Sequence, residues 1–269
     1  MERKIAFFDI DKTLTSETDE TIPESVIRSL SLARKNGHLM FINTGRCYQN
    51  LEDRFKNIGF DGYVCGCGTN IYIEENGRIN EMMHVFQPHS VAEIIIEHAR
   101  KFRLDILFES KYRVCFDTVH PLLCSGAEKQ YNIFKALGYD TVYDIDSKEF
   151  EFDKFVVWFE NIDDIKKFRE VSDTYFSCID RGGNFREFVP SGYSKASGIQ
   201  AVLDHYGIDL SKAYAFGDSN NDLPMLEYVT NSVAMGNAEP ASLCSKVSYV
   251  TAKASEDGIE KALMHFGFI

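Results

Sequence analysis

Residues 4–14 read KIAFFDIDKTL, an apolar run that stops at two closely spaced carboxylates. A short apolar run of this kind is typical of a strand buried on both faces, as in a parallel sheet. Asp9 and Asp11 therefore lie directly after the expected strand. In open α/β sheets, ligands bind at the carboxyl ends of the strands. The segment thus predicts a parallel sheet and also the edge where its functional site lies.

The chain that follows this segment supports a parallel sheet. A helical pattern begins at Pro23 and ends at Gly37, and residues 38–42 form a second apolar run. Strand, helix and strand in this order are typical of a βαβ unit. The residues expected on the buried face of the helix are Val26, Ile27, Leu30 and Ala33.

The last third of the chain repeats this order. Ser194 is placed to cap a helix that continues to about Tyr206 and ends at Gly207. A strand at 212–216 follows and stops at Gly217-Asp218. Further strands are expected at 232–235 and 246–250, and further helices at 223–228 and 256–266.

Between these two parts the pattern changes. Adjacent strands joined by tight turns favour an antiparallel sheet with helices. Helices are expected at 89–102, 127–137 and 163–171, and strands at 104–109, 112–116 and 155–159, with two more that meet at Gly182-Gly183. We therefore predict an α/β fold: a Rossmann-like, doubly wound parallel sheet core from residues 1–81 and 189–269, and an α+β cap domain inserted at 82–188.

Composition limits the classes of partner. The 269 residues are 44% hydrophobic and carry a net charge of −12, so we expect a folded, acidic protein. The electric field of a net negative charge repels nucleic acid and anionic membranes. The seven cysteines show no zinc spacing, and no apolar stretch approaches a membrane span. We expect a cytoplasmic protein with reduced thiols that is a monomer or a homodimer.

Three further motifs carry chemistry. Thr44-Gly45 offers a hydroxyl and an unhindered N–H at a strand end, where a phosphate oxygen can bind. Lys195 lies in the first turn of a helix, an unfavourable place for a cation unless an anion faces it. The segment 217–222, GDSNND, supplies the oxygen ligands that a hard cation prefers.

Simpler interpretations exist for each motif taken alone, such as a solvated turn or a surface lysine. A calcium loop is also possible at Asp9, but Leu14 stands where that loop requires glycine. The order of the four motifs along the chain is much more specific. It resembles that of the haloacid dehalogenase-like phosphohydrolases, and most closely the Cof-type sugar phosphatases of subclass IIB. Gly66-Cys67-Gly68 and Asp257-Gly258 agree with this resemblance.

The resemblance implies a role for each motif. Asp9 is the nucleophile that forms an aspartyl-phosphate, and Asp11 is the general acid and base. Mg²⁺ is held by Asp9, the backbone carbonyl of Asp11, and Asp218, while Asp222 supports the ion through water or orients Lys195. The transferred phosphoryl group is bound by Ile10, Thr44, Gly45, Lys195 and Asn221.

We therefore expect a Mg²⁺-dependent phosphatase of small phosphorylated metabolites, in particular sugar phosphates. A phosphomutase built on the same core and a non-catalytic metal- or phosphate-binding regulator are the alternatives. Lys12 departs from the family, which often has glycine there, so the turn after the nucleophile is open to question. Arg46 is a candidate contact to the cap or the substrate. Candidate cap contacts to the substrate are Arg181, Gly182, Gly183, Asn184 and Arg186.

Overall fold

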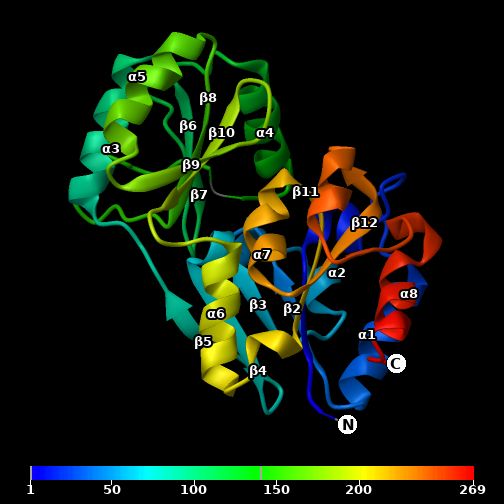
Figure 1. The fold of residues 1–269 in the computed structure, drawn as a ribbon. Helices are drawn as coiled ribbons and strands as arrows, with labels where there is room; N and C mark the ends of the chain where they lie inside the picture. The colour runs from blue at the N-terminus through cyan, green and yellow to red at the C-terminus, as the bar shows by residue number, and fades with distance from the viewer. Residues whose placement is uncertain (1, 140) are drawn as a thin grey trace. The chain divides into compact units, whose positions relative to one another are not determined.

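The computed structural model describes residues 2–139 and 141–269 and divides the chain into two units (Figure 1). The core runs to Met83 and resumes at Tyr193, and His84–Gly192 form an inserted unit. The inserted unit begins two residues later and ends four residues later than predicted, because a strand at each end continues past the expected boundary.

The core contains an eight-stranded sheet of order β13-β12-β11-β1-β2-β3-β4-β5. The pairs from β13 through β3 are parallel, as expected for the core, whereas β4 pairs antiparallel with β3. Strands β3, β4 and β5 extend the sheet beyond the strands that the sequence predicted. The strands are β1 (Ile5–Phe8), β2 (Leu39–Asn43), β3 (Gly62–Cys65), β4 (Asn70–Glu75), β5 (Arg78–His84), β11 (Ala213–Ser219), β12 (Asn231–Glu239) and β13 (Tyr249–Val250).

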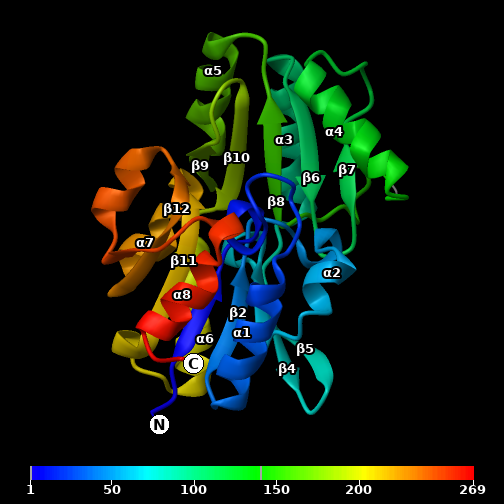
Figure 2. The ribbon, with the colours of Figure 1, turned by 90° about the vertical axis from the view of Figure 1, so that its right-hand side faces the viewer.

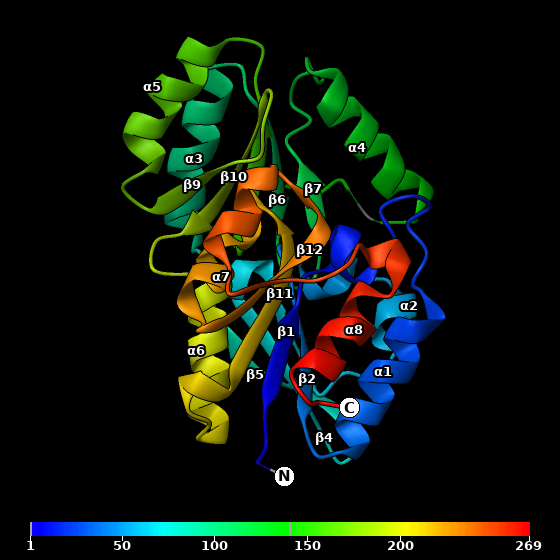
Figure 3. The same cartoon turned by 45° about the vertical axis from the view of Figure 1, so that its right-hand side comes forward.

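Helices cover both faces of this sheet, which makes the core doubly wound (Figure 3). Helices α1 and α8 lie side by side on one face (Figure 2), and Arg28 of α1 forms a 2.7 Å ion pair with Glu260 of α8. Helices α6 and α7 cover the other face. The helices of the core are α1 (Glu24–Lys35), α2 (Asp53–Lys56), α6 (Lys195–Tyr206), α7 (Leu223–Tyr228) and α8 (Gly258–His265).

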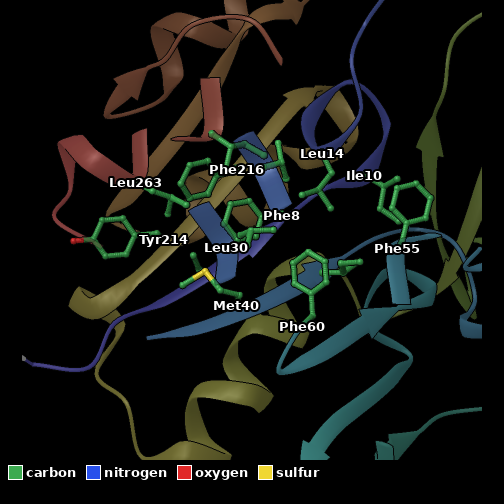
Figure 4. Close-up of a cluster of buried hydrophobic side chains, with 14 of the residues drawn as sticks. Phe8, Ile10, Leu14, Leu30, Met40, Phe55, Phe60, Tyr214, Phe216 and Leu263 are labelled. Carbon is green, nitrogen blue, oxygen red and sulfur yellow. The ribbon is translucent and has the colours of Figure 1, made fainter. Parts of the chain in front are cut away.

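Large side chains fill the layer between the sheet and α1 and α8 (Figure 4). Phe8 of β1 and Phe216 of β11 stack with ring centroids 4.5 Å apart. Each is fully buried, and truncation of such a side chain typically costs about 3–5 kcal/mol of stability. The core therefore holds β1 and β11 together next to their carboxyl ends.

One predicted core position in α1 is wrong. Ile27 is 44% exposed, whereas Val26, Leu30 and Ala33 are buried as expected. The buried stripe repeats every three to four residues and includes Ser29 rather than Ile27. Ile27 lies about 100° around the helix from Val26, toward solvent.

The inserted unit has an antiparallel sheet of order β7-β6-β8-β10-β9. Helices α3 and α5 pack on one face and α4 lies on the other (Figure 3). This agrees with the predicted α+β pattern. The elements are α3 (His89–Lys101), β6 (Asp105–Glu109), β7 (Val114–Phe116), α4 (Ser125–Ala136), β8 (Lys154–Trp158), α5 (Ile162–Ser172), β9 (Phe176–Asp180) and β10 (Phe185–Pro190). Among the described residues, every helix is too short or too polar to cross a bilayer.

Two glycines let the start of α6 approach the end of β3. A Cβ atom on Gly198 would lie 2.3 Å from Cγ1 of Val64. Gly68 has φ +92°, and a Cβ there would lie 2.3 Å from the carbonyl oxygen of Ser194. Ser194 caps α6 with its side chain, and Lys195 follows directly. The close approach therefore sets the position of Lys195.

Gly198→Ala should lower the free energy of unfolding by about 1–3 kcal/mol, because the added methyl group overpacks the contact with Val64. Urea unfolding measures the change. Gln200→Ala, on the exposed side of the same helix, is the control and should change it by less than about 0.5 kcal/mol. Equal effects of the two substitutions would show that the close approach is unimportant.

Candidate active site

Three carboxylates converge at the carboxyl ends of β1 and β11. Asp9 follows β1, Asp218 lies near the end of β11, and Asp222 belongs to the single turn Asn220–Asp222 that comes next. Oxygen atoms of the three side chains lie within 4.8 Å of one another, and all three residues are buried. Because β1 and β11 are parallel neighbours, residues far apart in sequence end at the same edge of the sheet.

Lys195 lies among these acids. Its Nζ donates to Oδ1 of Asp9 at 2.5 Å and to Oδ1 of Asp222 at 2.6 Å, and the residue is 2% exposed. The side chain of Asn43, at the end of β2, donates to the Lys195 carbonyl at 2.9 Å. The lysine therefore faces the acidic cluster rather than solvent. Asn43 has a positioning role that the motifs did not reveal, since in the sequence it only joins the predicted strand at 38–42 to Thr44.

The charges of this cluster perturb one another. Burial, and then Asp222, raise the pKa of Asp9, although Lys195 opposes this shift. Burial, Asp222 and Asp9 together raise the pKa of Asp218 to about 8. Burial disfavours the Lys195 ammonium, but Asp222 and Asp9 outweigh it and raise its pKa. Three carboxylates and one ammonium leave a formal charge of −2 when all are ionised.

Asp222 also shapes the loop that carries Asp218. Its Oδ2 accepts hydrogen bonds from the backbone N–H of Asp218 at 2.9 Å and of Ser219 at 3.1 Å. A Cβ on Gly217 would lie 2.6 Å from this carboxyl group, so the loop requires glycine there. Asp222 thus contacts Lys195 with one oxygen and holds the loop with the other.

The predicted phosphate-binding residues lie at the same sheet edge. Thr44 and Gly45 follow β2, the parallel neighbour of β1, and Ile10 begins the turn after β1. Oγ1 of Thr44 accepts from the backbone N–H of Arg46 at 3.2 Å. Asn221 hydrogen-bonds to Ser219 through its side-chain oxygen. Their roles in binding phosphate stay predictions.

The side chain of Asp11 lies apart from the three acids. It is 67% exposed, and its Oδ1 accepts from Nη2 of Arg46 at 2.6 Å. Its predicted role as acid and base, and the ligation of a metal by its carbonyl, stay predictions. The contact with Arg46 was not foreseen, although arginine two residues after Thr44 could have suggested it.

The turn after Asp9 has a backbone geometry that accounts for the glycine that the family often has at the position of Lys12. Lys12 has φ 57° and ψ 10°, a left-handed conformation that glycine adopts most easily. The side chain of Asn237 donates to the Lys12 carbonyl at 2.8 Å, which fixes the turn. The geometry that suits glycine is therefore retained with a lysine in its place, at a cost in backbone strain.

In the inserted unit, the predicted contacts around Gly182-Gly183 form a hairpin between β9 and β10. Arg186 donates from Nη1 to the carbonyl oxygens of Gly183 at 3.0 Å and Phe185 at 2.8 Å. Nε of Arg181 lies 3.8 Å from Oε2 of Glu187. These contacts stabilise the hairpin itself, and any role of Arg181, Gly182, Gly183, Asn184 and Arg186 toward a substrate stays a prediction.

Comparison with known proteins identifies the family. A model described as haloacid dehalogenase-like hydrolase matches residues 6–263. The chain belongs to this family.

Similar proteins indicate the activity and the subclass within this family. The 5-amino-6-(5-phospho-D-ribitylamino)uracil phosphatase YitU of Bacillus subtilis is 25% identical over 280 residues, 96% of this chain and 95% of that protein. The phosphatase BT1666 from Bacteroides thetaiotaomicron has a TM-score of 0.83 at 26% identity, covering 99% and 96% of the two chains. The subclass IIB sugar phosphatase BT4131 has a TM-score of 0.80 at 27% identity, covering 99% and 100%. This haloacid dehalogenase-like hydrolase is therefore a phosphatase of subclass IIB.

The donor set of the acidic cluster fits Mg²⁺. A hard divalent cation prefers carboxylate oxygens, and its charge would balance the formal −2 of the cluster. Burial first, and then repulsion between the acids, raise the pKa values of Asp9 and Asp218, and a bound cation would oppose both effects. The same repulsion gives a test through stability.

In metal-free protein, stability should fall as pH rises from about 4 to about 8. The unfolded chain releases the Asp218 proton near pH 4, whereas the folded chain keeps it until about pH 8. Asp218→Asn removes this difference in proton release between the folded and unfolded chain. The variant should therefore be roughly 1–3 kcal/mol more stable than the parent near pH 8 in EDTA, with a smaller difference in stability near pH 5. Urea unfolding measures both.

Added Mg²⁺ should make the parent more stable than Asp218→Asn near pH 8, because the parent binds the cation more tightly than the variant. Asp53→Asn is the control, since the Asp53 side chain is 92% exposed. A parent and an Asp218→Asn variant with the same pH dependence would contradict the predicted repulsion.

Lys12→Gly should raise the free energy of unfolding by about 0.5–1 kcal/mol, because glycine relieves the left-handed strain. Lys253→Gly is the matched control and should lower it, since Lys253 has φ −63°. Both are measured by thermal unfolding. Destabilisation by Lys12→Gly comparable to that of the control would show that the turn carries no strain.

Proposed function

We propose that this phosphatase is Mg²⁺-dependent and hydrolyses small phosphorylated metabolites, in particular sugar phosphates, through an aspartyl-phosphate on Asp9. The observation that carries the proposal is the convergence of Asp9, Asp218 and Asp222 within 4.8 Å around a buried Lys195. Asp9, the carbonyl of Asp11, and Asp218 would hold the ion. When bound, Mg²⁺ neutralises the acids and offsets the charge on the phosphoryl oxygens.

The residues of the chain divide the reaction into two displacements. An oxygen of Asp9 attacks phosphorus, and the bond to the ester oxygen breaks as Asp11 donates a proton to the leaving alkoxide. Water then attacks the phosphorus of the aspartyl-phosphate while Asp11 takes its proton, and the electron pair of the broken bond returns to the Asp9 carboxylate. Lys195, Thr44 and the N–H groups near them orient the phosphoryl oxygens.

The names of two relatives favour sugar phosphates as the substrate class. YitU is named for a phosphorylated ribityl compound and BT4131 as a sugar phosphatase, so both names describe a phosphate on a polyhydroxylated carbon chain. The phosphomutase alternative predicts transfer between sugar hydroxyls with little free phosphate. The regulator alternative predicts no turnover. The inserted unit as a cap, the cytoplasmic location and the oligomeric state stay predictions.

The decisive experiment measures phosphate release from p-nitrophenyl phosphate and a panel of sugar phosphates with Mg²⁺. We expect turnover that EDTA abolishes and Mg²⁺ restores. Asp9→Asn should reduce kcat at least about 10³-fold, because the amide cannot act as the nucleophile. Asp53→Asn should retain activity, since its side chain is 92% exposed on α2.

Full activity of Asp9→Asn would overturn the covalent mechanism. Isomerisation of a sugar phosphate without release of phosphate would favour the mutase. If phosphate release were seen only from substrates other than sugar phosphates, the substrate class would be wrong while the mechanism remained.

A further inference from the structure

Arg46 links the phosphate-binding loop to the second aspartate of the nucleophile motif. It is two residues beyond Thr44, whose Oγ1 accepts its backbone N–H, and its carbonyl accepts the N–H of Gly66 at 2.8 Å. Its Nη2 lies 2.6 Å from Oδ1 of Asp11. Within residues 2–139 and 141–269, this is the one ion pair that Asp11 makes.

The guanidinium of Arg46 also contacts Glu52, which precedes α2, and Phe55 of α2. Nη1 of Arg46 donates to Oε1 of Glu52 at 3.0 Å, and the guanidinium carbon lies 5.7 Å from the ring centroid of Phe55. Glu52 is fixed in turn by Nε of Arg54 at 2.7 Å. Because the donors of a guanidinium lie in one plane, a hydrogen bond that fixes Nη1 of Arg46 also fixes the direction in which Nη2 donates.

This support distinguishes the pair from an ordinary surface salt bridge. Exposed ion pairs contribute little because two flexible side chains must be ordered to form them. Here the Arg46 side chain is only 29% exposed, and Glu52 and Phe55 order it independently of Asp11. The orientation of the Asp11 carboxylate is therefore set by a group that is already in place.

Both displacements require the Asp11 carboxyl group to lie in a defined orientation relative to phosphorus, and the ordered guanidinium of Arg46 is a fixed partner for it. The second displacement depends on this orientation whatever the leaving group, because the attacking water must pass its proton to Asp11.

We propose that Arg46 is a positioning residue that orients the Asp11 carboxyl group for hydrolysis of the aspartyl-phosphate. In that step Asp11 accepts a proton from water, the water oxygen bonds to phosphorus, and the bond from phosphorus to Asp9 breaks with its electron pair returning to Asp9. Inorganic phosphate is released. The proposal rests on the proposed function, because it requires the covalent intermediate.

The test separates the two displacements with p-nitrophenyl phosphate. Its leaving group departs as a stable anion, so formation of the aspartyl-phosphate needs no proton from Asp11. Arg46→Met should lower kcat about tenfold, because hydrolysis becomes slower, while kcat/KM changes less than about twofold. KM should fall with kcat. Intact-protein mass spectrometry after an acid quench should show more phosphorylated enzyme at steady state than in the parent.

Arg54→Met is the matched control. Arg54 also pairs with Glu52, and its guanidinium carbon lies 4.7 Å from the same Phe55 ring, but it makes no contact with Asp11. The control should leave both kcat and the phosphorylated fraction within about twofold of the parent. Arg46→Lys keeps the charge without the fork, so its kcat should lie between those of the parent and Arg46→Met.

Each result decides for or against the role of Arg46. Parallel losses in kcat and kcat/KM would show that Arg46 binds the phosphoryl group instead, and an unchanged kcat would show that it has no role. If Arg46→Met does not fold, the phosphorylated fraction of Arg46→Lys provides the same test. The proposed function would survive any of these outcomes, because it depends on the loss of activity in Asp9→Asn.

Discussion

The arrangement depends on one buried cation placed between acids. The ammonium of Lys195 contacts Asp9 and Asp222 in a region where an uncompensated carboxylate would be costly. Its charge offsets part of the repulsion among three carboxylates, and the remainder favours a divalent cation. The fold brings these groups together by placing the end of β1, the end of β11 and the start of α6 at one edge of the sheet.

Rigid supports surround this cluster. Asn43 holds the backbone of Lys195, and Asp222 holds the loop of Asp218 through two backbone N–H groups. Gly198 allows α6 to approach β3. Each support acts on the position of a charged group rather than on its chemistry. Groups that are fixed before a substrate arrives need little reorganisation during a reaction, which is the usual basis of electrostatic catalysis.

Asp9 and Asp11 lie in different surroundings. Asp9 is buried beside other acids, whereas Asp11 is exposed and paired with Arg46. These surroundings suit the proposed mechanism, in which Asp9 is a nucleophile in a dry, charged site and Asp11 exchanges protons with water. Lys12, which follows Asp11 directly, has a left-handed backbone conformation. A difference of two residues in sequence thus separates two chemical environments.

The sequence by itself determined the parallel core, the order of its motifs and the edge of the sheet at which the acidic residues meet. Apolar runs that end in Asp9, Thr44 and Asp218 are local signals, and parallel strands carry their ends to one edge. Only the tertiary structure decided that Ile27 faces solvent, that β4 pairs antiparallel with β3, and that Asn43 and Arg46 support Lys195 and Asp11. These features depend on side chains from distant segments meeting in space, and local periodicity contains no information about such partners.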